Sequence, residues 1–122
     1  MDEISTERVA QLLDENPPTV VDIRDPPAFR RGHIPGSVNV PFRQLPDRVA
    51  ELADADHVVT VCPHGKSSVR AAELIESNEL VADATVASMA GGLRAWDGEI
   101  ESGRPGGESG RAETDEGPSA PF

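Results

Sequence analysis

The residues best suited to covalent chemistry lie in one short segment around Cys62, the only cysteine of the chain. A run of β-branched residues precedes Cys62 and a stretch with helical spacing follows it. Cys62 is therefore expected at the carboxyl end of a strand, where open α/β sheets bind their ligands. Gly65 allows the backbone to curl, and Ser67 or Ser68 is expected to cap the next helix. Amides around such a curl point inward and, with the helix dipole, predict a site for an anion.

This environment would change the protonation of the Cys62 thiol. An ordinary cysteine is only about 3% thiolate at pH 7. Amide donors, a helix N-terminus and Lys66, the only lysine present, would favour the thiolate and lower the pKa. The alternative is a buried structural cysteine, which is common after an apolar strand. Pro63 and Lys66 are poor core residues, and on residue types alone both interpretations stay open.

Length and composition limit the remaining possibilities. The chain has 122 residues, enough for one domain. Its 22 acidic and 11 basic residues give a net charge of −11, which argues against binding to nucleic acids or to anionic membranes. A single cysteine excludes an internal disulfide and a multi-cysteine metal site. The sequence has neither a long apolar run nor a basic start, so a cytoplasmic protein is expected. Because the chain has a single cysteine, no bound metal is expected.

The first 100 residues alternate between helical and strand patterns. Residues 5–16 have helical spacing, with Ser5 as the N-cap. Apolar and β-branched runs predict strands at residues 19–23, 37–40, 57–61 and 84–87, and helices are expected from Pro46, over residues 67–77 and over residues 93–96. This alternation favours an α/β fold with a mostly parallel sheet and helices on both faces. Residues 101–122 are acidic and rich in Gly, Pro and Ser, which predicts a disordered tail after one domain at residues 1–100.

Three motifs in this order resemble the signatures of single-domain rhodaneses, the thiosulfate sulfurtransferase family. The segment that resembles the family's active-site loop is Cys62-Pro63-His64-Gly65-Lys66-Ser67-Ser68. A second signature is similar to Asp22-Ile23-Arg24, Phe29 and residues 32–41, and a third to Gly91-Gly92 with Trp96. The resemblance covers about residues 3–100 and implies the rhodanese-like fold, a five-stranded sheet flanked by helices.

The resemblance also implies a two-step transfer of sulfur, with Cys62 as the catalytic residue and no cofactor. The Cys62 thiolate would attack the sulfane sulfur of thiosulfate, release sulfite and become a persulfide. The amides of residues 63–68 and the hydroxyls of Ser67 and Ser68 would stabilise the persulfide. A thiol, cyanide or a sulfur-carrier protein would then accept the sulfur, because the chain has no second cysteine to resolve the persulfide.

Two positions near the loop have more than one interpretation. Many rhodaneses carry Arg where Ser67 stands, and Lys66 would supply part of that positive charge. Arg24 is a candidate second contact to an anionic substrate. The alternative for Arg24 is an ion pair with Asp22 or Asp25.

The three histidines are expected to differ in role. His64 lies in the loop and either helps to hold an anion or points to solvent. His33 lies in a turn between Gly and Pro residues, where a structural hydrogen bond is expected. His57 is expected to be exposed at the start of a strand, and the spacing of these residues does not indicate a metal site.

Two other functions compete with sulfur transfer by the domain alone. Cysteine phosphatases and arsenate reductases have an Arg six residues after the cysteine, whereas this chain has Ser68 there and Arg70 further on. Without that guanidinium the loop lacks a bidentate clamp for a tetrahedral oxyanion. A sulfur-relay or docking module with little thiosulfate turnover remains open, although the presence of Cys62 argues against a purely scaffolding role.

The net charge opposes the approach of thiosulfate, which is a dianion. In molar salt the Debye length falls to about 3 Å, so the local field of the loop would dominate. Of the 11 basic residues only Lys66 is not Arg, and with the acid excess this favours the hypothesis of a halophilic protein. The net charge therefore predicts that thiosulfate turnover does not fall steadily as salt is raised.

Overall fold

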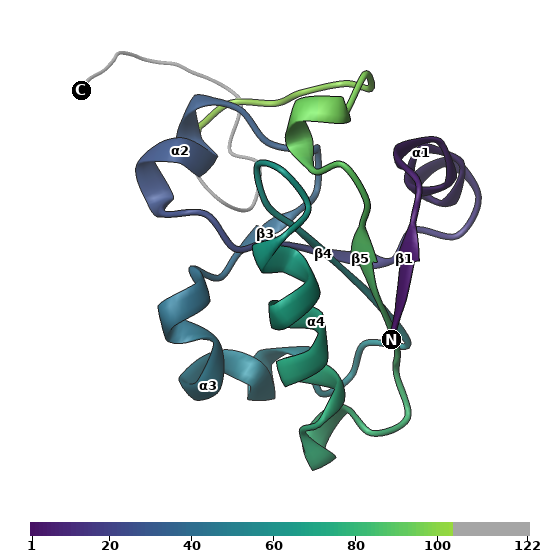
Figure 1. Cartoon of the computed structure of the whole chain (residues 1–122), viewed down its shortest axis with the longest axis vertical. Coiled ribbons are helices and arrows are strands. Elements are labelled where there is room, and N and C mark those ends of the chain that lie inside the picture. Colours follow the sequence, from purple (N-terminus) through teal and green to yellow (C-terminus); the bar gives the residue numbers. More distant parts are fainter. Residues whose placement is uncertain (104–122) are drawn as a thin grey trace.

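The computed structural model describes residues 1–103, which form one parallel sheet of five strands with helices around it (Figure 1). The strands are β1 (Asp2–Ile4), β2 (Thr19–Asp22), β3 (Val38–Asn39), β4 (His57–Val61) and β5 (Thr85–Met89), in the order β1-β5-β4-β2-β3. All of their pairings are parallel, so the five strands end at the same edge of the sheet. The predicted α/β fold and its five-stranded sheet are confirmed.

The helices follow the strands as the alternation predicted. They are α1 (Thr6–Glu15), α2 (Pro26–Arg31), α3 (Leu45–Arg48) and α4 (Ser67–Glu76), with 3-10 turns η1 (Phe42–Gln44), η2 (Val49–Leu52), η3 (Glu79–Val81) and η4 (Leu93–Ala95). Ser5 caps α1 as expected, because its side chain accepts a hydrogen bond of 3.0 Å from the amide of Arg8. None of the helices in residues 1–103 is long and apolar enough to cross a membrane.

The residue patterns missed two elements. β1 is three residues long, and its first two residues, Asp2 and Glu3, are exposed. Such a short edge strand has no alternating pattern, and it forms because its backbone pairs with β5. α2 begins with Pro26 and Pro27, which suit the first turn of a helix, but six residues are too few to produce a helical period.

Apolar side chains cover both faces of the sheet. Neighbouring residues of a strand point to opposite faces, so Val59 packs with Val9 of α1 while Val58 packs with Ile75 of α4. The predicted placement of helices on both faces is therefore confirmed. Cys62 belongs to the cluster on the α4 side, so its sulfur lies under the start of that helix.

The chain returns to α2 after η4. Glu101 forms an antiparallel bridge with His33, with amide-to-carbonyl hydrogen bonds of 2.8 Å in both directions. The buried His33 ring stacks on Phe29 with a centroid distance of 3.7 Å, and its Nδ1 donates a hydrogen bond of 2.7 Å to the Phe29 carbonyl. His33 thus makes the structural hydrogen bond expected of it. The predicted tail includes this bridge at its start, and residues 104–122 lie outside the described part of the chain.

Candidate active site

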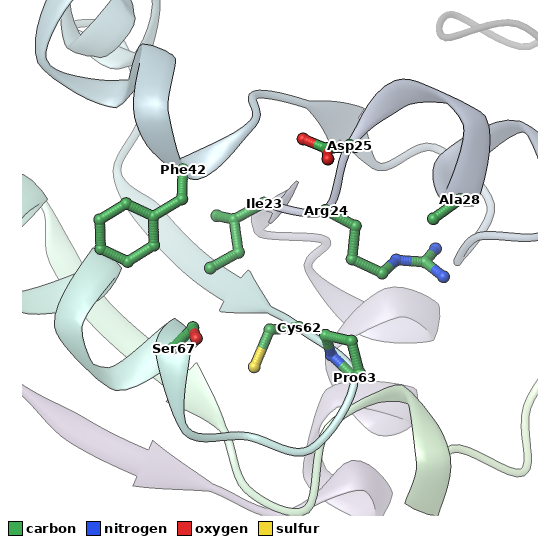
Figure 2. Close-up of a pocket in the computed structure, with 8 residues that line it drawn as sticks. All are labelled: Ile23, Arg24, Asp25, Ala28, Phe42, Cys62, Pro63 and Ser67. Carbon is green, nitrogen blue, oxygen red and sulfur yellow. The ribbon is translucent and has the colours of Figure 1, made fainter.

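A pocket opens at the edge of the sheet where β2 and β4 end. Asp22 and Val61, the last residues of these strands, lie opposite each other in the sheet. The segments that follow them therefore meet, and they enclose a cavity of about 370 Å³. Its lining residues are Ile23, Arg24, Asp25, Ala28, Phe42, Cys62, Pro63 and Ser67, and Figure 2 shows the sulfur of Cys62 between Ser67 and Pro63. This is the location expected for a ligand site in an open α/β sheet.

The Cys62 sulfur lies at the base of this pocket and is surrounded by hydrogen-bond donors. Only 2% of the residue is exposed. The amide of Gly65 donates to Sγ at 3.1 Å and the amide of Ser68 at 3.3 Å. In the thiol form, Sγ–H donates to the Ser68 hydroxyl at 3.4 Å. When the thiol loses its proton, the same hydroxyl can turn and donate to the sulfur.

The sulfur also satisfies the first turn of α4. The N-cap residue of α4 is Lys66, whose side chain makes no capping hydrogen bond. The expectation that Ser67 or Ser68 caps this helix is therefore wrong. Instead Cys62 Sγ accepts a hydrogen bond from the free amide of Ser68. This contact lies at the N-terminus of α4, where the helix dipole favours negative charge.

The pKa of the Cys62 thiol is lowered from its ordinary value. Burial, the largest single influence, raises the pKa because a buried thiolate is poorly solvated. The hydrogen bonds from the Ser68 hydroxyl and from the amides of Ser68, Gly65 and His64 lower the pKa, and together they outweigh burial. At neutral pH the thiolate fraction of Cys62 is therefore higher than that of a free cysteine.

The curl of the loop depends on two glycines that touch across it. Gly65 has φ +83° and Gly92, in the turn after β5, has φ +67°. A Cβ on Gly92 would lie 2.5 Å from the carbonyl oxygens of both Cys62 and Pro63. The next two amides of that turn, those of Leu93 and Arg94, donate to the same two carbonyls at 2.8 and 3.0 Å. The Gly91-Gly92 segment thus clamps the backbone of the loop. Spacing along the chain does not reveal this contact.

Two buried hydroxyls beneath the loop were missed by the sequence analysis. Thr60 of β4 and Ser88 of β5 lie opposite each other in the sheet, on the face that packs against α4. Ser88 Oγ is 2.7 Å from Ser68 Oγ, and Thr60 Oγ1 donates to the Ser68 carbonyl at 2.7 Å. The available signal was a polar residue at an inward position of an apolar strand, but nothing in the sequence linked it to Ser68.

Arg24 lines the pocket with its charge already paired. Its guanidinium donates to both oxygens of the buried Asp22, at 3.0 Å from Nε and 2.8 Å from Nη2, and Nη2 also donates to the Gly32 carbonyl at 2.7 Å. Asn39 completes this arrangement by donating to the carbonyls of Asp22 and Arg24 at 3.0 and 2.8 Å. The ion pair that sequence analysis weighed for Arg24 is the one with Asp22.

The remaining predicted loop residues contribute in different ways. Pro63 has no N–H, so it cannot donate as an amide, and it contributes an apolar wall and a carbonyl instead. Ser67 lines the pocket. The side chains of His64 and Lys66 are exposed and do not line the pocket, and His64 acts on the sulfur through its amide. Within residues 1–103 no group of three His, Cys, Asp or Glu side chains is placed to hold a metal.

Known proteins resemble the chain over nearly all of the described residues. The family model described as a rhodanese-like domain matches residues 5–99. Thiosulfate sulfurtransferase GlpE from Pseudomonas aeruginosa strain PAO1 is 42% identical over 94 residues, which cover 76% of this chain and 81% of that protein. The putative sulfur carrier protein YrkF from Bacillus subtilis is 29% identical over 100 residues, which cover 81% of this chain and 52% of YrkF. The solved rhodanese-like domain protein from Staphylococcus aureus is 26% identical, with a TM-score of 0.72 over 84% of this chain and 98% of that one.

The hydroxyl of Ser88 is expected to tune the Cys62 thiol through Ser68. In Ser88→Ala, Ser68 loses the partner that holds its hydroxyl in place, so the thiolate is less stabilised and the pKa of Cys62 rises. A hydrogen bond of about 1 kcal/mol net corresponds to about a five-fold change, so alkylation by iodoacetamide at neutral pH should slow by about two- to five-fold. The rate measured across pH should reach the wild-type plateau at alkaline pH. Ser77→Ala, at the far end of α4, is the control, and an unchanged pH profile in Ser88→Ala would contradict this role.

The clamp on the loop is expected to tolerate no side chain at Gly92. Gly92→Ala should lower the free energy of unfolding by about 2–4 kcal/mol, because the methyl group adds a clash to the strain of a positive φ. Gly36→Ala is a matched control, since Gly36 has φ +81° but a Cβ there meets nothing within 4 Å. Denaturant melts compare the stabilities, and alkylation of Cys62 reports on the loop. An equal loss of unfolding free energy in the two variants would show that the strain of a positive φ explains the whole effect and that the clash with the loop contributes nothing.

Proposed function

This chain belongs to the rhodanese-like domain family, and on that premise we propose that it moves a sulfane sulfur through a persulfide on Cys62. The donor is thiosulfate or another persulfide, and the acceptor is a thiol, cyanide or a sulfur-carrier protein. The observation that carries this proposal is the convergence of two amides and one hydroxyl on a cysteine sulfur at the base of an open pocket. The lowered pKa of Cys62 agrees with a role as nucleophile.

The first step is attack of the Cys62 thiolate on the outer sulfur of thiosulfate. The sulfur–sulfur bond of thiosulfate breaks and its electron pair leaves with sulfite, while a new sulfur–sulfur bond forms on Cys62. The product is a persulfide, Cys62–S–S⁻, and the charge of the reactants is conserved. Because the cysteine is only 2% exposed, a slender donor with a terminal sulfur is the kind of substrate that can reach it.

The persulfide then needs donors for its outer sulfur. The loop between β4 and α4 offers amides that point into the curl, with the positive end of the α4 dipole behind them. Donors that are oriented before the charge moves outward by one sulfur atom would lower the barrier to transfer. An incoming thiolate or cyanide attacks the outer sulfur and releases the Cys62 thiolate, so the cycle requires no oxidant or reductant.

Arg24, Ser67 and Lys66 are proposed as secondary contacts of the substrate. Arg24 and Ser67 line the pocket and can reach sulfonate oxygens of a bound donor. Asp22 neutralises most of the Arg24 charge, so Arg24 is expected to orient a donor more than to attract it. Lys66 lies outside the pocket lining and would act through its charge alone.

A relay role is the second candidate, and the similarity to YrkF favours it. In that case a protein-borne persulfide would react fast and thiosulfate slowly. Phosphatase or arsenate reductase chemistry has less support, because the position that would hold the clamping Arg is Ser68, whose hydroxyl faces the sulfur. Either sulfur reaction requires a reduced thiol, which agrees with the cytoplasmic location expected from the sequence.

Thiosulfate is expected to add one sulfur atom to Cys62. Intact mass spectrometry after incubation with thiosulfate should show a gain of about 32 Da, the mass of one sulfur in a persulfide. Cyanide should remove the added mass, and Cys62→Ser should never acquire it. Repeating the incubation with an organic persulfide separates the candidates, since loading by that donor alone favours the relay. If no sulfane donor loads the wild-type protein, sulfur transfer through Cys62 is wrong.

A further inference from the structure

Charge is distributed unequally between the two edges of the sheet. The segments that follow β2, β4 and β5, residues 23–32, 62–70 and 90–96, contain six basic residues and one acidic residue, Asp25. The segments that lead into the same strands, residues 14–18, 53–56 and 73–84, contain eight acidic residues and no Lys or Arg. Because the strands are parallel, the first group lies at the Cys62 edge and the second at the opposite edge (Figure 1).

Three of these basic residues, Arg31, Lys66 and Arg94, lie next to residues that line the pocket, and we call them the cationic rim. Arg31 comes three residues after the pocket residue Ala28 on α2, so both lie on one side of that helix. Lys66 belongs to the loop itself, and the amide of Arg94 binds the Pro63 carbonyl. All members of the rim are exposed, and none forms an ion pair with another residue in 1–103.

The pocket inside the rim offers mostly carbon atoms. Ile23, Ala28, Phe42 and Pro63 form its wall beside the sulfur, as Figure 2 shows for Ile23 and Phe42. Thiosulfate presents only sulfur and oxygen atoms, so such a wall gives it little to bind. A cysteine side chain on a peptide brings carbon atoms next to its sulfur. An apolar centre with an arginine-rich, polar rim is also the usual anatomy of a protein interface.

From these two observations we propose that the acceptor of the Cys62 sulfur is a protein thiol flanked by acidic side chains. The inference rests on the proposed function, since it names the partner of the same site. The acceptor thiolate attacks the outer sulfur of Cys62–S–S⁻, one sulfur–sulfur bond breaks, one forms, and the Cys62 thiolate leaves. The acidic side chains pair with the cationic rim while the acceptor cysteine enters the pocket.

The rim changes what the net charge predicts. At a net charge of −11 an acidic partner is repelled at long range. At an ionic strength near 0.15 M the Debye length is about 8 Å, so a docked partner responds to the nearby rim more than to the distant acidic edge. Transfer to an acidic acceptor should therefore slow as salt is raised, which is the opposite of the trend that net charge predicts for thiosulfate.

The test uses three hexapeptides that differ only in the residues around one cysteine, which are Glu, Gln or Lys. The full-length protein is first loaded with sulfur, and transfer to each peptide is followed by mass spectrometry. Each rate is divided by the rate of the same peptide with a neutral small disulfide, which corrects for differences in thiol pKa. The Glu peptide should exceed the Lys peptide by about ten-fold at low salt, and the difference should vanish near 1 M salt, where the Debye length is about 3 Å.

Variants separate the rim from the total charge. Arg31→Glu with Arg94→Glu should abolish or reverse the preference for the Glu peptide. Arg31→Glu combined with Asp54→Lys leaves the net charge at its wild-type value and should still weaken the preference, whereas Asp54→Lys alone should leave it unchanged. An equal preference in all of these proteins would overturn the proposal.

Two further outcomes keep this inference distinct from the proposed function. Failure to load sulfur refutes the proposed function itself, whereas loading without a peptide preference refutes only the acidic partner. The other possible occupant of the rim is the chain's own acidic segment at residues 113–116. If replacing Glu113, Asp115 and Glu116 by Gln in the full chain speeds transfer to all three peptides equally, that segment is the occupant and the proposal is wrong.

Discussion

The hydrogen bond from the Ser68 amide to the Cys62 sulfur is the contact on which the rest of the site depends. A helix begins with amides that have no partner within the helix, and a buried sulfur has few groups to satisfy it. In this structure the Ser68 amide and the Cys62 sulfur are hydrogen-bond partners, so each supplies the group that the other lacks. For that to happen, β4 must end at Val61, the chain must curl at Gly65, and α4 must begin at Ser67. This arrangement lowers the pKa of the Cys62 thiol and suits the nucleophilic role that we propose for it.

The loop owes its shape to the strands beneath it and to the turn beside it. Ser88 and Thr60 bind the first turn of α4 from the sheet, one through the Ser68 hydroxyl and one through its carbonyl. Gly92 and the two amides after it hold the carbonyls of Cys62 and Pro63. The amide donors are thus fixed before any charge develops, which is the condition under which they lower a barrier most.

A parallel sheet separates its two edges, and this chain places different charges on them. Every loop that follows a strand lies at the same edge as Cys62, and every loop that leads into a strand lies at the far edge. The strongly acidic composition is therefore compatible with a positive rim at the pocket. The net charge alone describes a uniformly charged sphere and does not contain this difference between the two edges. The pKa of Cys62 is lowered by the amides and the hydroxyl that bind its sulfur, whereas the acids before β4 are a strand length away.

The sequence alone determined only features that depend on residues close together in the chain. β-Branched runs predicted β2 and β4, Ser5 marked the start of α1, and the residues around Cys62 identified the family. Short-range patterns of this kind missed β1 and α2, and they assigned the cap of α4 to a serine instead of the sulfur. Only the tertiary structure decided that Ser88 and Gly92 contact the loop around Cys62, and that Arg24 is held by Asp22. Their contacts join residues far apart in the chain, and the register of parallel strands that brings them together is set by packing on both faces of the sheet.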